Sequence, residues 1–219
     1  MSIKLQISND GSHTVYSGAF SETYHSINGA ITESIHVFIE AGLRQMQKSQ
    51  ISIFEIGFGT GLNAFLSLLE ADNRGIEITY DALELYPVGE EVYAALNYPK
   101  TLGTNREVAF KHIHTSNWGE RVVITEHFSL QKHKIDIRAF KYPENNYDVV
   151  YFDAFSPVVQ PELWGQEIFN AIYRSMCTGG ILTTYCAKGE VRRTMQRAGF
   201  SVERLPGPPG KREMLRAIK

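Results

Sequence analysis

The stretch that decides the fold of this chain is Ile51-Ser52-Ile53-Phe54-Glu55-Ile56-Gly57-Phe58-Gly59-Thr60-Gly61-Leu62. It opens with a short apolar run, typical of a buried strand, and continues with three glycines at alternate positions. Glycine allows a tight turn and a close approach of the backbone to a ligand, because no Cβ intervenes. Apolar residues at helical spacing follow over residues 62–69. The stretch therefore predicts a strand, a ligand-binding turn and a helix.

The same alternation continues to the carboxyl terminus. We expect strands at residues 51–56, 76–83, 129–135, 147–153 and 181–185, helices at 62–69, 87–97, 106–118, 163–176 and 191–198, and a closing antiparallel pair at 201–205 and 213–218. The run at 147–153 is apolar almost throughout, as a strand buried on both faces should be. This order predicts an α/β, Rossmann-like fold with a seven-stranded, mostly parallel sheet and helices on both faces.

Residues 1–50 precede this core and have a different pattern. A turn signal at Asn9-Asp10-Gly11 predicts a hairpin within residues 5–24, and residues 33–47 have the apolar spacing of a helix. No repeat or Pro/Gly/Ser-rich linker divides the 219 residues. We therefore expect a hairpin and helix, at residues 1–50, packed on a single core of residues 51–219.

Composition narrows the class of protein. Hydrophobic residues make up 43% and charged residues 21%, which is ordinary for a globular protein. No stretch reaches the roughly 18 apolar residues of a membrane helix, and no secretory signal opens the chain. Cys177 and Cys186 are not in a Cys-x-x-Cys arrangement, which argues against a disulfide framework and a zinc site. We expect a cytoplasmic protein without a metal ion and without a membrane partner.

Charge is distributed unevenly along the chain. The formal net charge is −2, but residues 188–219 hold nine Lys or Arg against three Glu, a balance of +6, so the other 187 residues carry −8. A basic face for an anionic ligand and an ordinary solvated helix surface both fit this asymmetry.

Acidic residues follow the predicted strand rhythm: Glu55, Glu84, Asp136 and Asp153 each fall at or beside a strand end. In an open α/β sheet, ligands bind outside the carboxyl ends of the strands. Glu84 can accept hydrogen bonds from ribose hydroxyls there, and Asp136 can accept them from an adenine amino group. Leu62 stands where a dinucleotide motif, Gly-x-Gly-x-x-Gly, requires glycine, so the pattern favours S-adenosylmethionine over NAD and leaves NAD as the alternative.

Asp153 ends the most apolar strand and is the candidate catalytic residue. A carboxylate there can orient an amine nucleophile, help to remove its proton and offset the charge on the attacking nitrogen. The alternative is a loop carboxylate that caps the following helix.

Several motifs resemble the methyltransferase domain of the MnmC-type tRNA wobble-uridine enzymes. They are Glu55-Ile56-Gly57-Phe58-Gly59-Thr60-Gly61-Leu62-Asn63, Glu84-Leu85-Tyr86-Pro87, Asp153-Ala154-Phe155-Ser156-Pro157, Pro161-Glu162-Leu163-Trp164, Thr183-Thr184-Tyr185, Gly189 with Val191-Arg192-Arg193, Ala198-Gly199-Phe200 and Gly210-Lys211-Arg212-Glu213-Met214-Leu215. The resemblance covers the chain from about Gly29 onward and implies a class I methyltransferase. It implies a cofactor site at Glu55, Gly57, Gly59, Gly61, Asn63, Glu84 and Asp136, with Asp153 as the active-site carboxylate.

The resemblance implies methylation of the exocyclic amine of 5-aminomethyl-(2-thio)uridine at tRNA position 34. The anticodon loop would be the partner, contacted by Phe155, Pro157, Trp164, Lys188, Arg192, Arg193, Lys211 and Arg212.

Many members fuse this domain to a flavin-dependent oxidase, for which 219 residues leave no room, so we expect no FAD and a separate oxidase or upstream modification enzyme. Lys188 stands where members usually have a small residue. A small-molecule N-methyltransferase and a non-catalytic RNA-binding module are the alternatives, and Trp164 fits helix packing equally well.

Overall fold

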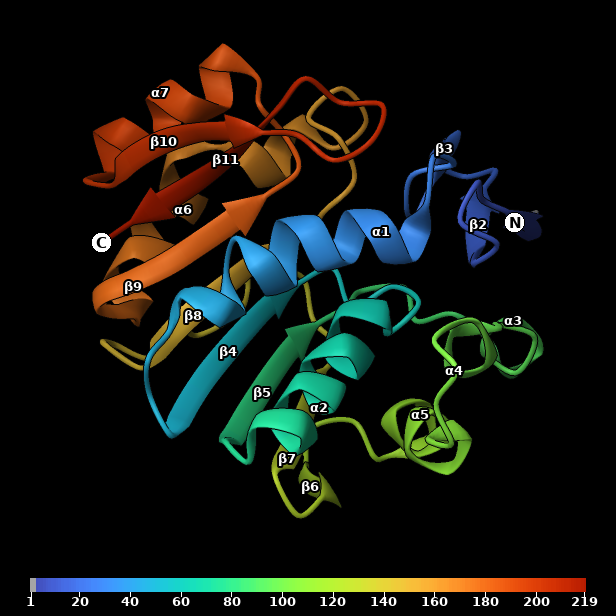
Figure 1. Ribbon diagram of the computed structural model, residues 1–219. Coiled ribbons are helices and arrows are strands. Elements are labelled where there is room, and N and C mark those ends of the chain that lie inside the picture. The colour runs from blue at the N-terminus through green and yellow to red at the C-terminus, as the bar shows by residue number, and fades with distance from the viewer. Residues whose placement is uncertain (1–2) are drawn as a thin grey trace.

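The computed structural model describes residues 3–219, and its core is built around one sheet (Figure 1). Eight strands lie in the order β10-β11-β9-β8-β4-β5-β7-β6. The parallel strands are β4 (Gln50–Ile56), β5 (Glu77–Leu83), β7 (Phe128–His133), β8 (Tyr147–Phe152) and β9 (Met176–Thr184), whereas β6 (Arg121–Thr125), β10 (Ser201–Pro206) and β11 (Glu213–Ile218) pair antiparallel with their neighbours. The predicted α/β fold with a mostly parallel sheet is confirmed.

Helices cover both faces of this sheet (Figure 1). One face carries α1 (Ala30–Ser34), its π-helical continuation η1 (Ile35–Glu40), α2 (Leu62–Arg74) and α5 (Glu107–Thr115), and the other carries α6 (Gln166–Ser175) and α7 (Gly189–Ala198). Shorter turns of helix are η2 (Leu43–Gln45), α3 (Glu90–Tyr93), α4 (Tyr98–Thr101) and η3 (Pro161–Trp164). Within residues 3–219, no helix has the length and apolar character needed to span a membrane.

The position of strand β8 in the sheet explains its run of four apolar residues, Val149 to Phe152. Val149 and Tyr151 pack into the core beneath α2, whereas Val150 and Phe152 pack into the core beneath α6 and α7. All four side chains are fully buried. A strand covered by helices on both faces cannot alternate apolar with polar residues, so the predicted burial of this strand on both faces is confirmed.

The residues that precede the core in the sequence form a second sheet of three strands. It contains β1 (Ile3–Ile7), β2 (His13–Ser17) and β3 (Glu22–Thr23), in that order, and β1 and β2 form the predicted hairpin. The hairpin is tied to the core because Asn97 accepts a hydrogen bond from the backbone N–H of His13 at 2.8 Å.

Four parts of the chain differ from the sequence-based expectation. The helix expected at residues 33–47 begins earlier and is divided into α1, η1 and η2. Strand β6 adds an eighth strand at the edge of the sheet. The helix expected at residues 87–97 contracts to α3. Gly179 and Gly180, a pair that favours a turn, lie inside β9, because the N–H of Gly179 donates to the backbone oxygen of Lys219 and the oxygen of Gly180 accepts from the N–H of Lys219, just after β11. In this last case, pairing with a distant segment overrides the local turn preference of two glycines.

Candidate active site

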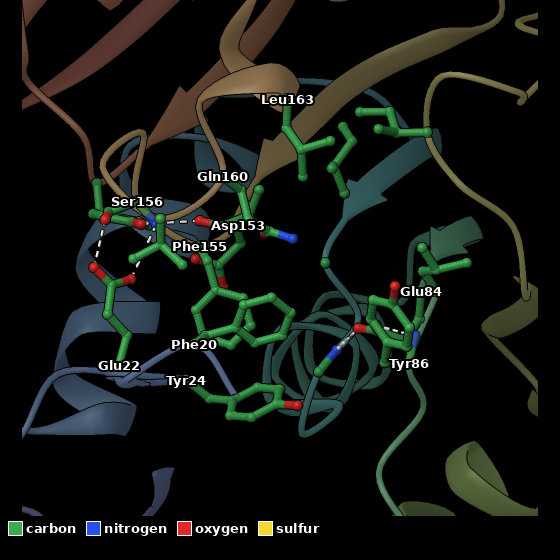
Figure 2. A pocket seen from close by; sticks show the side chains of 18 of the residues that line it. Phe20, Glu22, Tyr24, Glu84, Tyr86, Asp153, Phe155, Ser156, Gln160 and Leu163 are labelled. Carbon is green, nitrogen blue, oxygen red and sulfur yellow. Dashed lines mark hydrogen bonds between the residues drawn. The ribbon is translucent and has the colours of Figure 1, made fainter. Parts of the chain in front are cut away.

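A cavity of about 500 Å³ lies at the carboxyl ends of the parallel strands. The glycine turn after β4, the segment after β5 and the loop after β8 form its walls, and residues 20–27 of the amino-terminal region close one side. Figure 2 shows Asp153 and Phe155 on one side of this space and Glu84 and Tyr86 on the other. The cavity therefore occupies the position at which open α/β sheets bind ligands.

The glycine turn needs its glycines for two physical reasons. Gly57 has a φ of +91°, in the region that side chains with a Cβ rarely adopt, and a Cβ on it would lie 2.5 Å from the backbone oxygen of Asp153. Gly61 has a φ of +70° and leads into α2. The turn can thus pass directly beside the end of β8, which brings a ligand held by the turn next to Asp153.

Glu84 joins the turn to the next strand. Its Oε2 accepts a hydrogen bond from the N–H of Gly59 at 2.9 Å, and its Oε1 accepts one from the N–H of Tyr86 at 2.8 Å (Figure 2). Burial raises the pKa of this carboxyl above its usual value. Each carboxylate oxygen can accept a further hydrogen bond, so Glu84 can bind ribose hydroxyls at the cavity wall.

Asp136 also lines the cavity, but it lies in the loop beyond β7 rather than at the strand end. Arg138 donates hydrogen bonds to its Oδ1 from the backbone N–H at 2.8 Å and from Nε at 2.9 Å. These bonds hold the pKa of Asp136 below its usual value. Its carboxylate is therefore ionised and forms an ion pair with Arg138.

Asp153 is half-buried at the point where β8 ends. Its N–H donates to the backbone oxygen of Ile56 at 2.9 Å, and its Oδ2 accepts a hydrogen bond from the Asn63 amide at 2.8 Å. Burial and then the nearby Glu33 carboxylate raise the pKa of Asp153 to about 7, while the Asn63 hydrogen bond and the Lys211 ammonium act in the opposite direction. A carboxylate with this pKa can exchange a proton near neutral pH.

Lys211, predicted to contact tRNA, lies in the cavity wall. Its Nζ forms an ion pair with the buried Glu33 and lies 4.0 Å from the centre of the Tyr185 ring. The Tyr185 hydroxyl in turn donates to the backbone oxygen of Ala154 at 2.9 Å. The ion pair joins α1 to the segment between β10 and β11 and supplies a positive charge near Asp153.

The amino-terminal segment supplies site residues that sequence reasoning missed. Glu22 accepts hydrogen bonds from the N–H of Ser156, at 3.1 Å, and from its hydroxyl (Figure 2). The ring of Phe155 lies 4.5 Å from that of Phe20 and 5.1 Å from that of Tyr24, measured between centroids. No local signal marks Glu22, Phe20 or Tyr24, because their role depends on where the hairpin docks.

Other predicted site residues lie outside the cavity lining. Glu55, Gly61 and Asn63 lie behind it, and Pro157 is half-buried in the loop after β8. Trp164 is buried against Phe152, and its Nε1 donates to the backbone oxygen of Phe155 at 2.9 Å. This geometry favours the packing role for Trp164 over contact with a base.

The other four basic residues that were predicted to contact tRNA lie at the surface. Lys188, Arg193 and Arg212 are exposed and Arg192 is half-buried. Lys188, Arg192 and Arg193 lie at the start of α7, which follows β9 at the same edge of the sheet as the cavity. They can therefore contact an anionic ligand that enters the cavity from this side.

Sheet order, glycine turn and strand-end carboxylates together define a class I methyltransferase. Positive-φ glycines without room for a Cβ, a carboxylate on the next strand and a cavity between them fit an adenosyl cofactor. The comparison with known families agrees, since residues 101–219 match the family described as S-adenosyl-L-methionine-dependent methyltransferase. The chain belongs to this family.

Individual relatives share the sequence and the fold. The bifunctional protein MnmC of Azoarcus sp. (strain BH72), named for tRNA 5-methylaminomethyl-2-thiouridine biosynthesis, is 34% identical over 231 residues, covering 97% of this chain. The chain spans only 35% of that relative's length. The crystal structure of MnmC2 from Aquifex aeolicus superimposes with a TM-score of 0.77 at 24% identity, covering 99% of this chain and 70% of that one. Spermidine synthase from Thermotoga maritima has a TM-score of 0.56 at 11% identity, covering 94% and 68%.

Proposed function

We propose that this protein methylates the exocyclic amine of 5-aminomethyl-(2-thio)uridine at wobble position 34 of tRNA, giving 5-methylaminomethyl-(2-thio)uridine. The names of the MnmC relatives, which match nearly the whole chain, support the tRNA substrate. The observation that carries the reaction is the position of Asp153, in the wall of the cavity directly beside the glycine turn. This juxtaposition suits transfer of a methyl group to a nucleophile that needs a proton acceptor.

S-adenosylmethionine supplies an electrophilic methyl group on its sulfonium. Gly57, Gly59 and Glu84 would hold this cofactor, since they line the cavity and Glu84 has acceptor capacity left for ribose hydroxyls. Asp136 lines the same cavity and would act at the adenine end. Fixing the methyl donor in one place removes part of the entropic barrier to transfer.

Asp153 would act on the substrate amine. An aliphatic amine is largely protonated near neutral pH and cannot attack until it loses a proton. The ionised form of Asp153 accepts a hydrogen bond from the amine, orients its lone pair toward the methyl group and takes up the proton. Because the pKa of Asp153 is about 7, enough of this form is present at neutral pH.

The remaining predicted residues would bind the anticodon loop. Phe155, next to Phe20 and Tyr24, offers aromatic surface at the cavity wall for stacking of an extruded base. Lys188, Arg192, Arg193 and Arg212 would contact the phosphate backbone. A separate oxidase or an upstream wobble-modification enzyme would supply the aminomethyl substrate, and we propose the cytoplasm as the compartment, where the free Cys177 and Cys186 stay reduced.

Mass spectrometry of wobble nucleosides tests the substrate. Cells that lack the protein should accumulate the aminomethyl form of the wobble uridine, and re-expression of the wild-type chain should remove it. Re-expression of Asp153→Asn should not, because turnover should fall by about 10²–10⁴-fold with the proton acceptor gone. The variant should still bind S-adenosylmethionine in calorimetry. An unchanged nucleoside profile in the deletion strain, or equal activity on the free aminomethyl nucleoside and on tRNA, would contradict the tRNA assignment.

A further inference from the structure

Asn63 connects two carboxyl groups beside the glycine turn, those of Glu55 and Asp153. It lies in the first turn of α2, two residues after Gly61, and is only 2% exposed. Its Nδ2 donates one hydrogen bond to Oε1 of Glu55 at 3.0 Å and another to Oδ2 of Asp153 at 2.8 Å. An amide NH₂ has two hydrogens, so this side chain uses its full donor capacity on two residues that lie far apart in the sequence.

Glu55 anchors the amide. Its side chain is fully buried, and burial raises the pKa of Glu55 well above its usual value, which favours the neutral acid over the carboxylate. Its Oε1 accepts the hydrogen bond from Asn63 in either protonation state. Among residues 3–219, the Asn63 Oδ1 atom is buried without a hydrogen-bond partner. The orientation of the amide therefore depends on its two carboxyl partners.

This arrangement leaves one face of Asp153 open. Asn63 binds Oδ2 from behind the cavity, and the backbone N–H of Asp153 is bound to Ile56, so rotation of the carboxylate is restricted. The other oxygen, Oδ1, remains to meet a substrate in the cavity that Asp153 lines. A proton acceptor works best when its lone pairs are already aimed at the reacting group.

We propose that Asn63, anchored by Glu55, is a positioning residue for amine methylation: it holds Asp153 with one oxygen turned toward the substrate rather than contacting the cofactor. The proposal rests on the proposed function for its substrate. It replaces the expectation that Glu55 and Asn63 bind the cofactor, since neither lines the cavity. In the Glu-x-Gly-x-Gly-x-Gly-x-Asn motif, the glycines then form the ligand-binding turn, and Glu55 and Asn63 orient Asp153.

Every charged or titratable group facing Asp153 bears on the test. Glu33 on α1 raises the pKa of Asp153, whereas Lys211, in the segment after β10, and the Asn63 hydrogen bond lower it. Asp153 also interacts with the hydroxyls of Tyr80 on β5 and Tyr185 after β9 and with Glu55 on β4. Replacing Asn63 removes only one of these influences, so its effect on the titration of Asp153 has a defined direction: the pKa should rise.

The experiment compares Asn63→Leu with the wild type and with Asn73→Ala, a change of an exposed asparagine on the same helix. Carbon-13 NMR of aspartate-labelled protein follows the titration of Asp153, assigned with Asp153→Asn. The pH dependence of kcat/KM on tRNA is measured in parallel, and calorimetry measures S-adenosylmethionine binding. Asn63→Ser serves in place of Asn63→Leu if the leucine variant does not fold.

For Asn63→Leu we expect a titration of Asp153 at higher pH, the acid limb of the kcat/KM profile displaced in the same direction, and a kcat about tenfold to a hundredfold lower. Cofactor affinity should stay within about twofold, about 0.4 kcal/mol. Glu55→Gln should retain most activity, because its amide oxygen can still accept from Asn63. An unchanged Asp153 titration, or a loss of activity explained entirely by lost cofactor binding, would overturn the proposal. Wild-type protein inactive on tRNA would refute the proposed function, and the NMR titration would still decide the role of Asn63.

Discussion

At the scale of single residues, the site contains carboxyl groups whose ionised form is destabilised by burial. Asp153, Glu55 and Glu84 are all placed where burial raises the pKa of a carboxyl. Such groups reduce the stability of the fold and are retained where chemistry needs them. Glu33 and Lys211 show the opposite solution, since each compensates the charge of the other.

The raised pKa of Asp153 has a consequence for stability. A carboxyl with a folded-state pKa of about 7, against an ordinary value of 3.8, binds its proton more tightly in the folded protein. Its contribution to stability is therefore fully present below pH about 4 and is lost as the pH rises through 7. Asp153→Asn cannot ionise, so its Tm should exceed that of the wild type by a few °C at pH 8, where ~1 kcal/mol shifts Tm by ~2–4 °C. Thermal melts at pH 4 should show a much smaller difference, and a constant difference across this range would contradict the raised pKa.

At the scale of elements, two segments from different parts of the chain meet at the end of β8. The glycine turn approaches it from β4, and β3 approaches it from the amino-terminal sheet through the Glu22 and Ser156 contact. The predicted roles of Gly57, Gly59 and Glu84 depend on the first approach, and the enclosure of the cavity depends on the second (Figure 2). The segment of residues 20–27, which contains β3, is thus part of the site rather than an addition to the core.

The glycine turn can be tested with a single methyl group. Gly57→Ala forces a Cβ into a position 2.5 Å from the backbone of Asp153 at a φ of +91°. The turn should shift, and S-adenosylmethionine affinity should fall by about tenfold or more, which is ~1.4 kcal/mol. Gly75→Ala is the matched control: it also has a positive φ, at +61°, but its Cβ would meet nothing within 4 Å. The control should lose about 1–2 kcal/mol of stability and no cofactor affinity in calorimetry. Equal affinity in both variants would remove the turn from the cofactor site.

At the scale of the whole molecule, charge and topology act together. The basic residues Lys188, Arg192 and Arg193, at the start of α7, lie at the same sheet edge as the cavity, because α7 follows the carboxyl end of β9. These three residues place part of the +6 charge of residues 188–219 at this edge. A polyanion such as tRNA would be oriented by this distribution before its target base reaches the cavity.

Charge reversal tests this orientation. Arg192→Glu combined with Arg193→Glu should weaken tRNA binding at least tenfold, or ~1.4 kcal/mol, and reduce its salt dependence, while cofactor affinity stays unchanged. Lys100→Glu combined with Lys111→Glu makes the same charge change on exposed residues of α4 and α5, away from α7 (Figure 1). Filter binding of tRNA at low and high salt should distinguish the two pairs. Equal losses in both pairs would indicate that only net charge matters.

The sequence by itself determined the strand at residues 51–56, the glycine turn and the start of the helix at Leu62, the buried strand β8, and the placement of Glu84 and Asp153 beside strand ends. These features follow from patterns within a few residues, where periodicity and glycine conformation leave little choice. Only the tertiary structure decided that Asn63 meets Asp153 across 90 residues, that Glu22 meets Ser156 across 134 and that Lys211 meets Glu33 across 178. Contacts of this range depend on how the packed elements dock, and no local pattern in the chain encodes that docking.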